Sequence, residues 1–164
     1  MNFKPRIGNI WLFLIVATSF SLTSNYVLGQ LNQMKMLLTY KLGWVDGSQQ
    51  QIWLYQTLQG IYNVGACAGA FSASVFMAYG RRNALLLTGL VFTVGAILTQ
   101  FMDFWMLTIS RLISGFGCGM SLCITSRITE EYVPLAMYTI ASPFNIFMLQ
   151  MGSFLGLISA VVLP

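Results

Sequence analysis

Long apolar runs alternate with short polar connections along almost the whole chain. Five runs, at about residues 10–30, 52–77, 84–101, 104–124 and 138–163, are each close to the roughly 20 residues that a membrane helix needs. Backbone polar groups inside lipid must be satisfied within their own segment, so each run is predicted to be an α-helix. The pattern therefore predicts an all-α integral membrane bundle of five transmembrane helices, forming a single domain over residues 1–164.

The run at 52–77 is the least hydrophobic of the five. It carries Gln56, Gln59, Asn63 and Ser72. Polar side chains within membrane helices usually face other protein or a water-filled cavity, so one face of this helix is predicted to be covered by protein or water.

The composition agrees with a membrane protein. Charged residues make up 7% of the chain, against about 25% in soluble domains. The mean hydropathy is +0.73. So few charges cannot cover a water-facing surface, and we expect membrane lipids or other membrane subunits to cover most of the molecule.

The basic residues are distributed unevenly between the two sides of the predicted bundle. One side carries Lys4, Arg6, Arg81, Arg82 and Arg127, and the other carries Lys35 and Lys41. By the positive-inside rule this bias places the N-terminus on the inner side. The cations sit at the ends of apolar runs and form no basic stripe, so no nucleic-acid partner is expected.

The residue types argue against an enzyme. Histidine is absent, which removes the usual general base and metal ligand. Cys67, Cys118 and Cys123 lie inside apolar runs and form no metal-binding or disulfide pattern. We predict no catalytic residue, no metal site and no cofactor.

Small residues recur at four-residue spacing in three of the runs. The pairs are Gly65 and Gly69, Gly115 and Gly119, and Gly152 and Gly156. This spacing allows helix backbones to approach closely, so these glycines are predicted to pack helices together.

Four short motifs resemble the N-terminal half of a major facilitator superfamily sugar porter of the glucose-transporter type. They are the basic turn Tyr79-Gly-Arg-Arg82, the helical pattern from Arg111 to Gly119, the sequence Glu131-Tyr-Val-Pro134, and Asn25-Tyr26 near the end of the first run. They follow one another in the family's order, and the resemblance covers about residues 25–163. It implies a helical membrane fold and sugar transport.

The chain also departs from the family pattern. The residues before the basic turn are Met77 and Ala78, and the Arg-Gly pair expected after the fourth run is replaced by Tyr138 and Thr139. Ile146 occupies the position of a sugar-binding glutamine. Val27 stands where proton-coupled members have an acidic residue. The resemblance therefore implies a degenerate porter half without proton coupling.

The resemblance gives a role to one group of charges, which we call the inner-face charge cluster. It comprises Arg81, Arg82, Arg127, Glu130 and Glu131. In the family such residues form salt bridges that help to hold one state of the transport cycle, and we expect at least one Arg–Glu pair. The alternative is that the arginines set topology and contact lipid phosphates.

Arg111 is the most deeply embedded charge, about two turns into the fourth run. An intramembrane arginine is a candidate functional residue because burying its charge is costly. Two interpretations remain open. Arg111 is either a structural anchor that extends outward or pairs with Asp103, or part of a substrate pathway.

Three functional hypotheses follow. The first is a non-transporting accessory subunit of a larger membrane complex, derived from a sugar-porter half that lacks a sixth helix. The alternatives are a half-size hexose facilitator acting as a dimer, or a fragment of a full sugar transporter; a sugar substrate is expected under these alternatives alone.

The accessory hypothesis predicts partner subunits on two faces. These are the polar face of the second run, and the face of the fifth run with Asn145, Gln150, Gly152 and Gly156. A mitochondrial inner membrane is one candidate location, because its complexes recruit small hydrophobic subunits. The plasma membrane and the membranes of other organelles are the other candidate locations.

Overall fold

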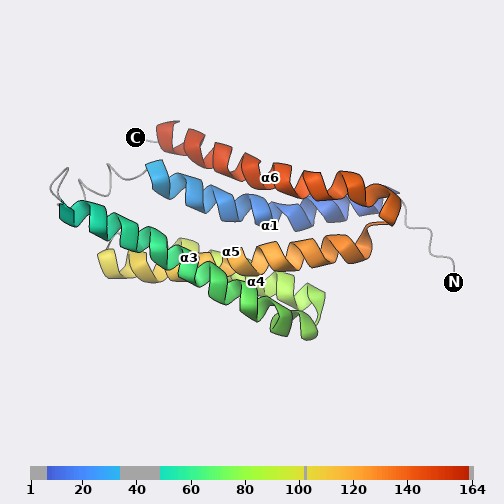
Figure 1. Ribbon diagram of the computed structural model, residues 1–164, viewed down its shortest axis with the longest axis horizontal. Helices are drawn as coiled ribbons and strands as arrows, with labels where there is room; N and C mark the ends of the chain where they lie inside the picture. Colours follow the sequence, from blue (N-terminus) through green and yellow to red (C-terminus); the bar gives the residue numbers. More distant parts are fainter. Residues whose placement is uncertain (1–6, 34–48, 102, 163–164) are drawn as a thin grey trace.

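The computed structural model describes residues 7–33, 49–101 and 103–162, and these form an all-α bundle. The helices are α1 (Ile7–Gln33), α3 (Gln49–Ala78), α4 (Arg81–Thr99), α5 (Phe104–Tyr132) and α6 (Leu135–Val162). Successive helices run in opposite directions along the long axis (Figure 1). The predicted fold class is confirmed. Lys4, Arg6, Lys35 and Lys41 lie outside the described residues.

Four helices are individually long and apolar enough to span a membrane. They contain the spans Gln51–Ala78, Arg81–Thr99, Phe104–Tyr132 and Met137–Ser159. Within the part of the chain that the structure describes, the apolar stretch of α1 is the shorter Leu14–Gly29. The expectation of five spans is thus met on these criteria for four helices.

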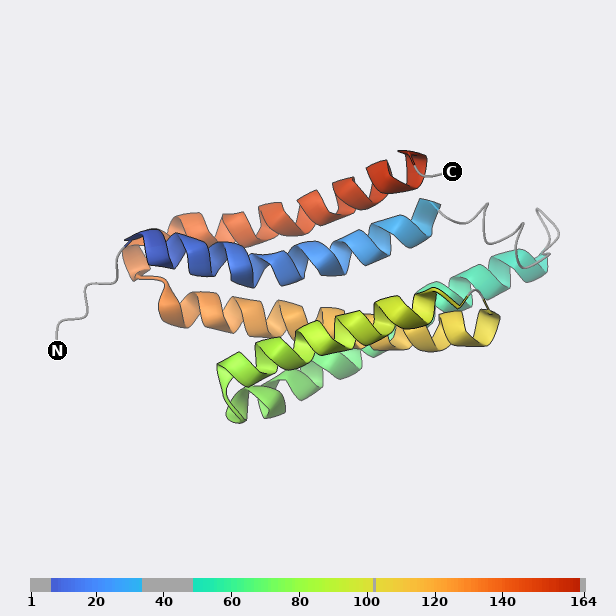
Figure 2. The same ribbon diagram turned by 180° about the vertical axis from the view of Figure 1, so that it is seen from behind.

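Helix α5 is the centre of the bundle and contacts each of the other helices. In its most apolar window 61% of the residues are buried, against 22% or less in α3, α4 and α6. Helix α3 packs most extensively on α5, and α1 packs on α6. Figures 1 and 2 show the α1–α6 pair as one layer, with α5 between that layer and α3 and α4.

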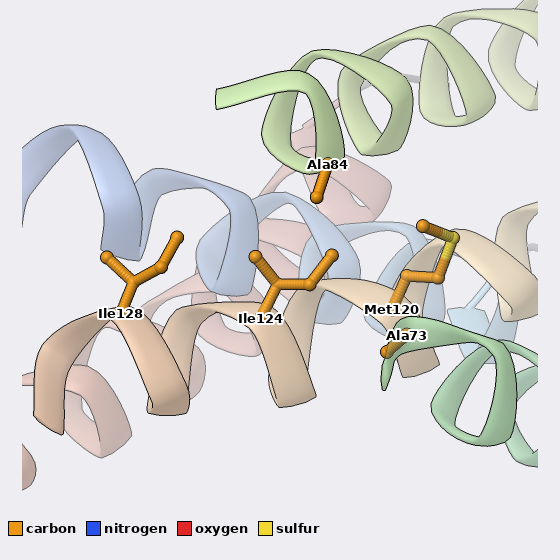
Figure 3. Close-up of a cluster of buried hydrophobic side chains, with 5 residues drawn as sticks. All are labelled: Ala73, Ala84, Met120, Ile124 and Ile128. Carbon is orange, nitrogen blue, oxygen red and sulfur yellow. The ribbon is translucent and has the colours of Figure 1, made fainter. Parts of the chain in front are cut away.

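The main hydrophobic core joins three helices. Met120, Ile124 and Ile128 project from α5 toward Ala73 of α3 and Ala84 of α4, and all five are at most 1% exposed. Figure 3 shows the small alanines facing the larger α5 side chains. Many large apolar side chains on the outside of the bundle are exposed, including Phe71 and Trp105. Such a surface suits lipid.

The charged end of α5 corrects the sequence interpretation. The fourth run was expected to end near residue 124, but α5 continues to Tyr132 and includes Arg127, Glu130 and Glu131. It ends there because Pro134 disfavours helical backbone at the preceding residue, and Val133 is extended with φ −92° and ψ 124°. Similarly, α4 begins at Arg81, three residues earlier than expected, directly after Gly80 with φ 108°.

Candidate functional site

Arg111 is buried where α1, α3 and α5 meet. Its side chain is 4% exposed. The guanidinium Nη1 donates a hydrogen bond to the backbone carbonyl of Val27 in α1, over 3.3 Å. Its Nε has no hydrogen-bond partner among the described residues. Two tyrosines of α3, Tyr55 and Tyr62, are close enough to interact with its charge. Arg111 therefore points into the bundle.

Of the alternatives left open for Arg111, the structure shows neither the pairing with Asp103 nor the outward extension of the side chain. Asp103 is exposed at the residue before α5. Across residues 7–33, 49–101 and 103–162 the sole ion pair joins other residues. The physical reason is the position of α1 beside α5, which offers a carbonyl oxygen as acceptor on the buried side. A carbonyl lacks a full negative charge, so the guanidinium charge is left without a carboxylate from the described residues.

A tyrosine that the sequence analysis did not single out borders this site. Tyr62 is 4% exposed, and its hydroxyl donates to the backbone carbonyl of Ser24 over 3.3 Å. Asn25, the next residue, donates from Nδ2 to the carbonyl of Leu149 in α6 over 3.0 Å. These bonds tie α1 to α3 and to α6. The available signal was the rule that a buried tyrosine hydroxyl requires an acceptor, but the sequence does not identify that acceptor.

The turn between α3 and α4 brings part of the inner-face charge cluster together at one end of the bundle. The Arg81 Nε and the Glu131 carboxylate form an ion pair between the start of α4 and the last turn of α5. Their side chains remain 51% and 41% exposed. Arg82, Arg127 and Glu130 are also exposed, and the described residues give them no ion pair. The structure thus joins two of the five residues.

Glycines bring the backbones of α3 and α5 together. A Cβ at Gly65 or Gly69 would overlap the carbonyl oxygen of Leu112 or Phe116. In the other direction, a Cβ at Gly115 or Gly119 would overlap the carbonyl of Tyr62 or Ala66. The two small-residue patterns therefore face each other. Close approach of this kind is how small residues promote membrane-helix packing.

The glycines of α6 pack against α1, as their spacing predicted, so this part of the face assigned to partner subunits lies inside the bundle. A Cβ at Gly152 would overlap the carbonyl oxygen of Leu22 in α1, and Gly156 is also buried. On the α1 side, a Cβ at Gly29 would lie 2.9 Å from the carbonyl oxygen of Ser153. Because α1 supplies a closely packed backbone, Gly152 and Gly156 join two helices of this chain and are not available to a partner.

Amide side chains remain on the outer faces of α3 and α6. Gln56, Asn63 and Gln150 are exposed, and Gln59 is half-buried. Asn145 is half-buried, and its Oδ1 is buried with no hydrogen-bond partner in the part of the chain that the structure describes. The neighbouring Ile146 is 61% exposed. These residues give α3 and α6 polar groups within otherwise apolar surfaces.

The described residues contain no group of three or more His, Cys, Asp or Glu side chains that could hold a metal ion. The three cysteines are free thiols: Cys67 is exposed, Cys118 is buried and Cys123 is half-buried. The polar groups considered as candidate functional residues are the buried Arg111 with its tyrosines, the Arg81–Glu131 pair, and the outer amides.

Comparisons with known proteins agree with this arrangement. Residues 13–163 match the family model described as "Sugar (and other) transporter". Solute carrier family 2, facilitated glucose transporter member 3, is similar in Oryctolagus cuniculus, with 28% identity over 113 residues, and in Rattus norvegicus, with 31% over 114. Each alignment covers 66% of this chain and 22% of the relative.

Sugar transport protein 12 of Arabidopsis thaliana is 33% identical over 82 residues, which cover 49% of this chain and 15% of that protein. The aligned part of the chain thus spans only 15–22% of the length of these relatives. The match to the family model, in contrast, extends over most of the chain and includes most of α1 and all of α3, α4, α5 and α6. The chain belongs to the sugar (and other) transporter family.

Proposed function

We propose that these helices form part of one wall of a hexose pathway in a sugar facilitator. The observation that carries the proposal is the family match over residues 13–163. The relatives with which the chain aligns are named as facilitated glucose transporters and a sugar transport protein. In our proposal the opposite wall comes from further helices, either of a second copy or of a longer protein, because transporters bind substrate between two repeats.

The exposed amides support a pathway lined in part by α3 and α6. Gln56 and Asn63 of α3 and Gln150 of α6 are exposed. Each amide group offers both hydrogen-bond donors and an acceptor, which match the hydroxyls of a sugar. Facing hydrocarbon they would lack hydrogen-bond partners, at a cost in free energy. A water-filled pathway relieves that cost.

The distribution of acidic residues supports facilitated movement without proton coupling. Among the described residues the carboxylates are Asp103, Glu130 and Glu131, which are all exposed and lie near helix ends. Asp46 lies outside them. Arg111 contacts the backbone of Val27, at the position where proton-coupled porters carry an acidic residue. Among the described residues, no carboxylate lies beside Arg111 to take up and release a proton. We infer that sugar moves down its own gradient.

The test is uptake by the full-length protein that carries these helices, reconstituted into proteoliposomes. We expect saturable uptake of labelled D-glucose, with L-glucose excluded. Asn63→Leu should lower the initial rate by about fivefold, the effect of one lost hydrogen bond of average strength in the transport step. Thr57→Val is the matched control, because the Thr57 hydroxyl is exposed on the same helix but already donates to the carbonyl of Trp53. Uptake no faster than in empty vesicles contradicts the proposal.

A non-transporting accessory role is the second candidate. It is favoured by Ile146, an exposed apolar residue where the family resemblance implies a sugar-binding glutamine. This role would place the chain beside other subunits, with a mitochondrial inner membrane as one location. It predicts stable copurification with unrelated membrane subunits and no sugar uptake. In both proposals we expect the N-terminus on the inner side, because of the lysine and arginine bias.

A further inference from the structure

Two hydrogen bonds between helices meet at neighbouring residues of α1. Tyr62 of α3 is 4% exposed, and its hydroxyl donates to the carbonyl of Ser24 over 3.3 Å. That carbonyl belongs to the planar peptide unit that joins Ser24 to Asn25. The Asn25 side chain donates in turn to the carbonyl of Leu149 in α6 over 3.0 Å. One short segment of α1 therefore connects α3 with α6.

Both ends of this connection lie next to an exposed amide. On α3, Asn63 directly follows Tyr62 and is exposed. On α6, the accepting carbonyl belongs to the planar peptide unit that joins Leu149 to the exposed Gln150. Asn63 and Gln150 are two of the amides that line the pathway in the proposed function. A displacement of α3 or α6 at this level therefore moves one amide relative to the other.

The main packing interfaces do not by themselves set the distance between these two amides. Helix α3 packs most extensively on α5, and α6 packs on α1, so the two helices have different neighbours. Arg111 and Thr125 of α5 also donate to α1 carbonyls, those of Val27 and Ala17. Those bonds join α5 to α1 and do not involve α6. The Tyr62 and Asn25 bonds, in contrast, link one amide-bearing helix to the other.

We propose that Tyr62 and Asn25 are positioning residues, which set the separation of the Asn63 and Gln150 amides and thereby the affinity for a hexose. This inference rests on the proposed function. A sugar bound by two amides is held best when both reach its hydroxyls with good hydrogen-bond geometry. Hydrogen bonds between membrane helices add only modestly to stability, so their removal should leave the fold intact and act on sugar affinity.

The first test is the concentration dependence of D-glucose uptake by the full-length protein that carries these helices, in proteoliposomes. Tyr62→Phe keeps the ring but removes the donor. It should raise KM by about fivefold, the effect of one sugar hydrogen bond lost, and leave Vmax nearly unchanged. Asn25→Ala should do the same. Because the two bonds act in series, the double variant should have no higher KM than the more affected single variant.

Thr125→Val is the matched control. It removes a buried hydroxyl that donates to the carbonyl of Ala17 over 3.4 Å. Ala17 lies about 10 Å along α1 from Ser24, at the rise of an α-helix. We expect its KM to equal that of the parent. An unchanged KM in Tyr62→Phe overturns the proposal, as does an equal rise in Thr125→Val. If the parent itself shows no uptake, the proposed function fails, and the link to sugar affinity fails with it.

A second measurement tests the connection without transport. Spin labels on Asn63→Cys and Gln150→Cys, in a background without native cysteines, report the distance between the two positions by pulsed electron paramagnetic resonance. We expect a broader distance distribution when Tyr62→Phe is added, and no change when Thr125→Val is added. Identical distributions in all three proteins would show that the connection does not set the separation, whether or not the protein transports sugar.

Discussion

Two arginines near opposite ends of helix α5 have contrasting surroundings. Near its start Arg111 is 4% exposed and donates to a backbone carbonyl, with no carboxylate from the described residues beside it. Near its end Glu131 pairs with Arg81, and both side chains are about half exposed. Burying a charge is costly, whereas an exposed pair contributes little in either direction. The buried arginine is therefore the one whose presence requires a functional reason.

The buried surroundings of Arg111 depend first on how closely the backbones of α3 and α5 approach each other. Gly119→Ala should lower the free energy of unfolding by about 1–3 kcal/mol, because the added Cβ overlaps the Ala66 carbonyl oxygen and forces the backbones apart. The measurement is the unfolding midpoint in mixed detergent micelles. Gly60→Ala is the control, since a Cβ at Gly60 would have no atom within 4 Å. Equal midpoints for the two variants would contradict close packing at this interface.

Arg111→Leu separates a functional role from an anchoring role. We expect the free energy of unfolding to rise by about 1 kcal/mol, because leucine fills the site without a buried charge. Uptake of labelled D-glucose should nevertheless be lost. Asp103→Asn should change neither quantity, because Asp103 is exposed and does not pair with Arg111. A variant that unfolds would instead identify Arg111 as a structural anchor.

Substitutions in the exposed Arg81–Glu131 pair should have the smallest effect on stability. A double-mutant cycle with Arg81→Gln and Glu131→Gln should give a coupling close to experimental error, because solvent and side-chain entropy weaken an exposed pair. Raising the ionic strength should reduce that coupling further. The cycle uses the thermal unfolding midpoint at low and high salt. A coupling that is large and independent of salt would show that this pair is shielded in the membrane-bound protein.

Particular residues show how far the sequence could predict this site. The spacing of Gly65, Gly69, Gly115 and Gly119 was sufficient to predict packing surfaces, because helical periodicity alone places such residues on one face. The acceptor of Arg111 could not be predicted from spacing. Asp103 is its neighbour in sequence, whereas Val27 is remote, and the choice between them depends on where α1 packs.

The same limit explains the other corrections. Gly152 and Gly156 belong to an internal interface because α1 runs alongside α6, which their own segment does not reveal. The end of α5 is a partial exception. Pro134 provided a local stop signal, but the fourth run was expected to end near residue 124. Polar residues at the end of a long helix can still be helical when they lie beyond the apolar span.

The sequence by itself determined the all-α membrane class, the order of the helices and the family resemblance. These follow from local properties: hydrophobic length, short turns and motifs along one chain. The tertiary structure decided which helices pair, that Arg111 turns inward to Val27, and that Tyr62 and Asn25 connect α3 with α6 through α1. Those outcomes depend on contacts between residues far apart in the chain. Local hydropathy cannot specify such contacts, because many arrangements of the same helices satisfy it equally well.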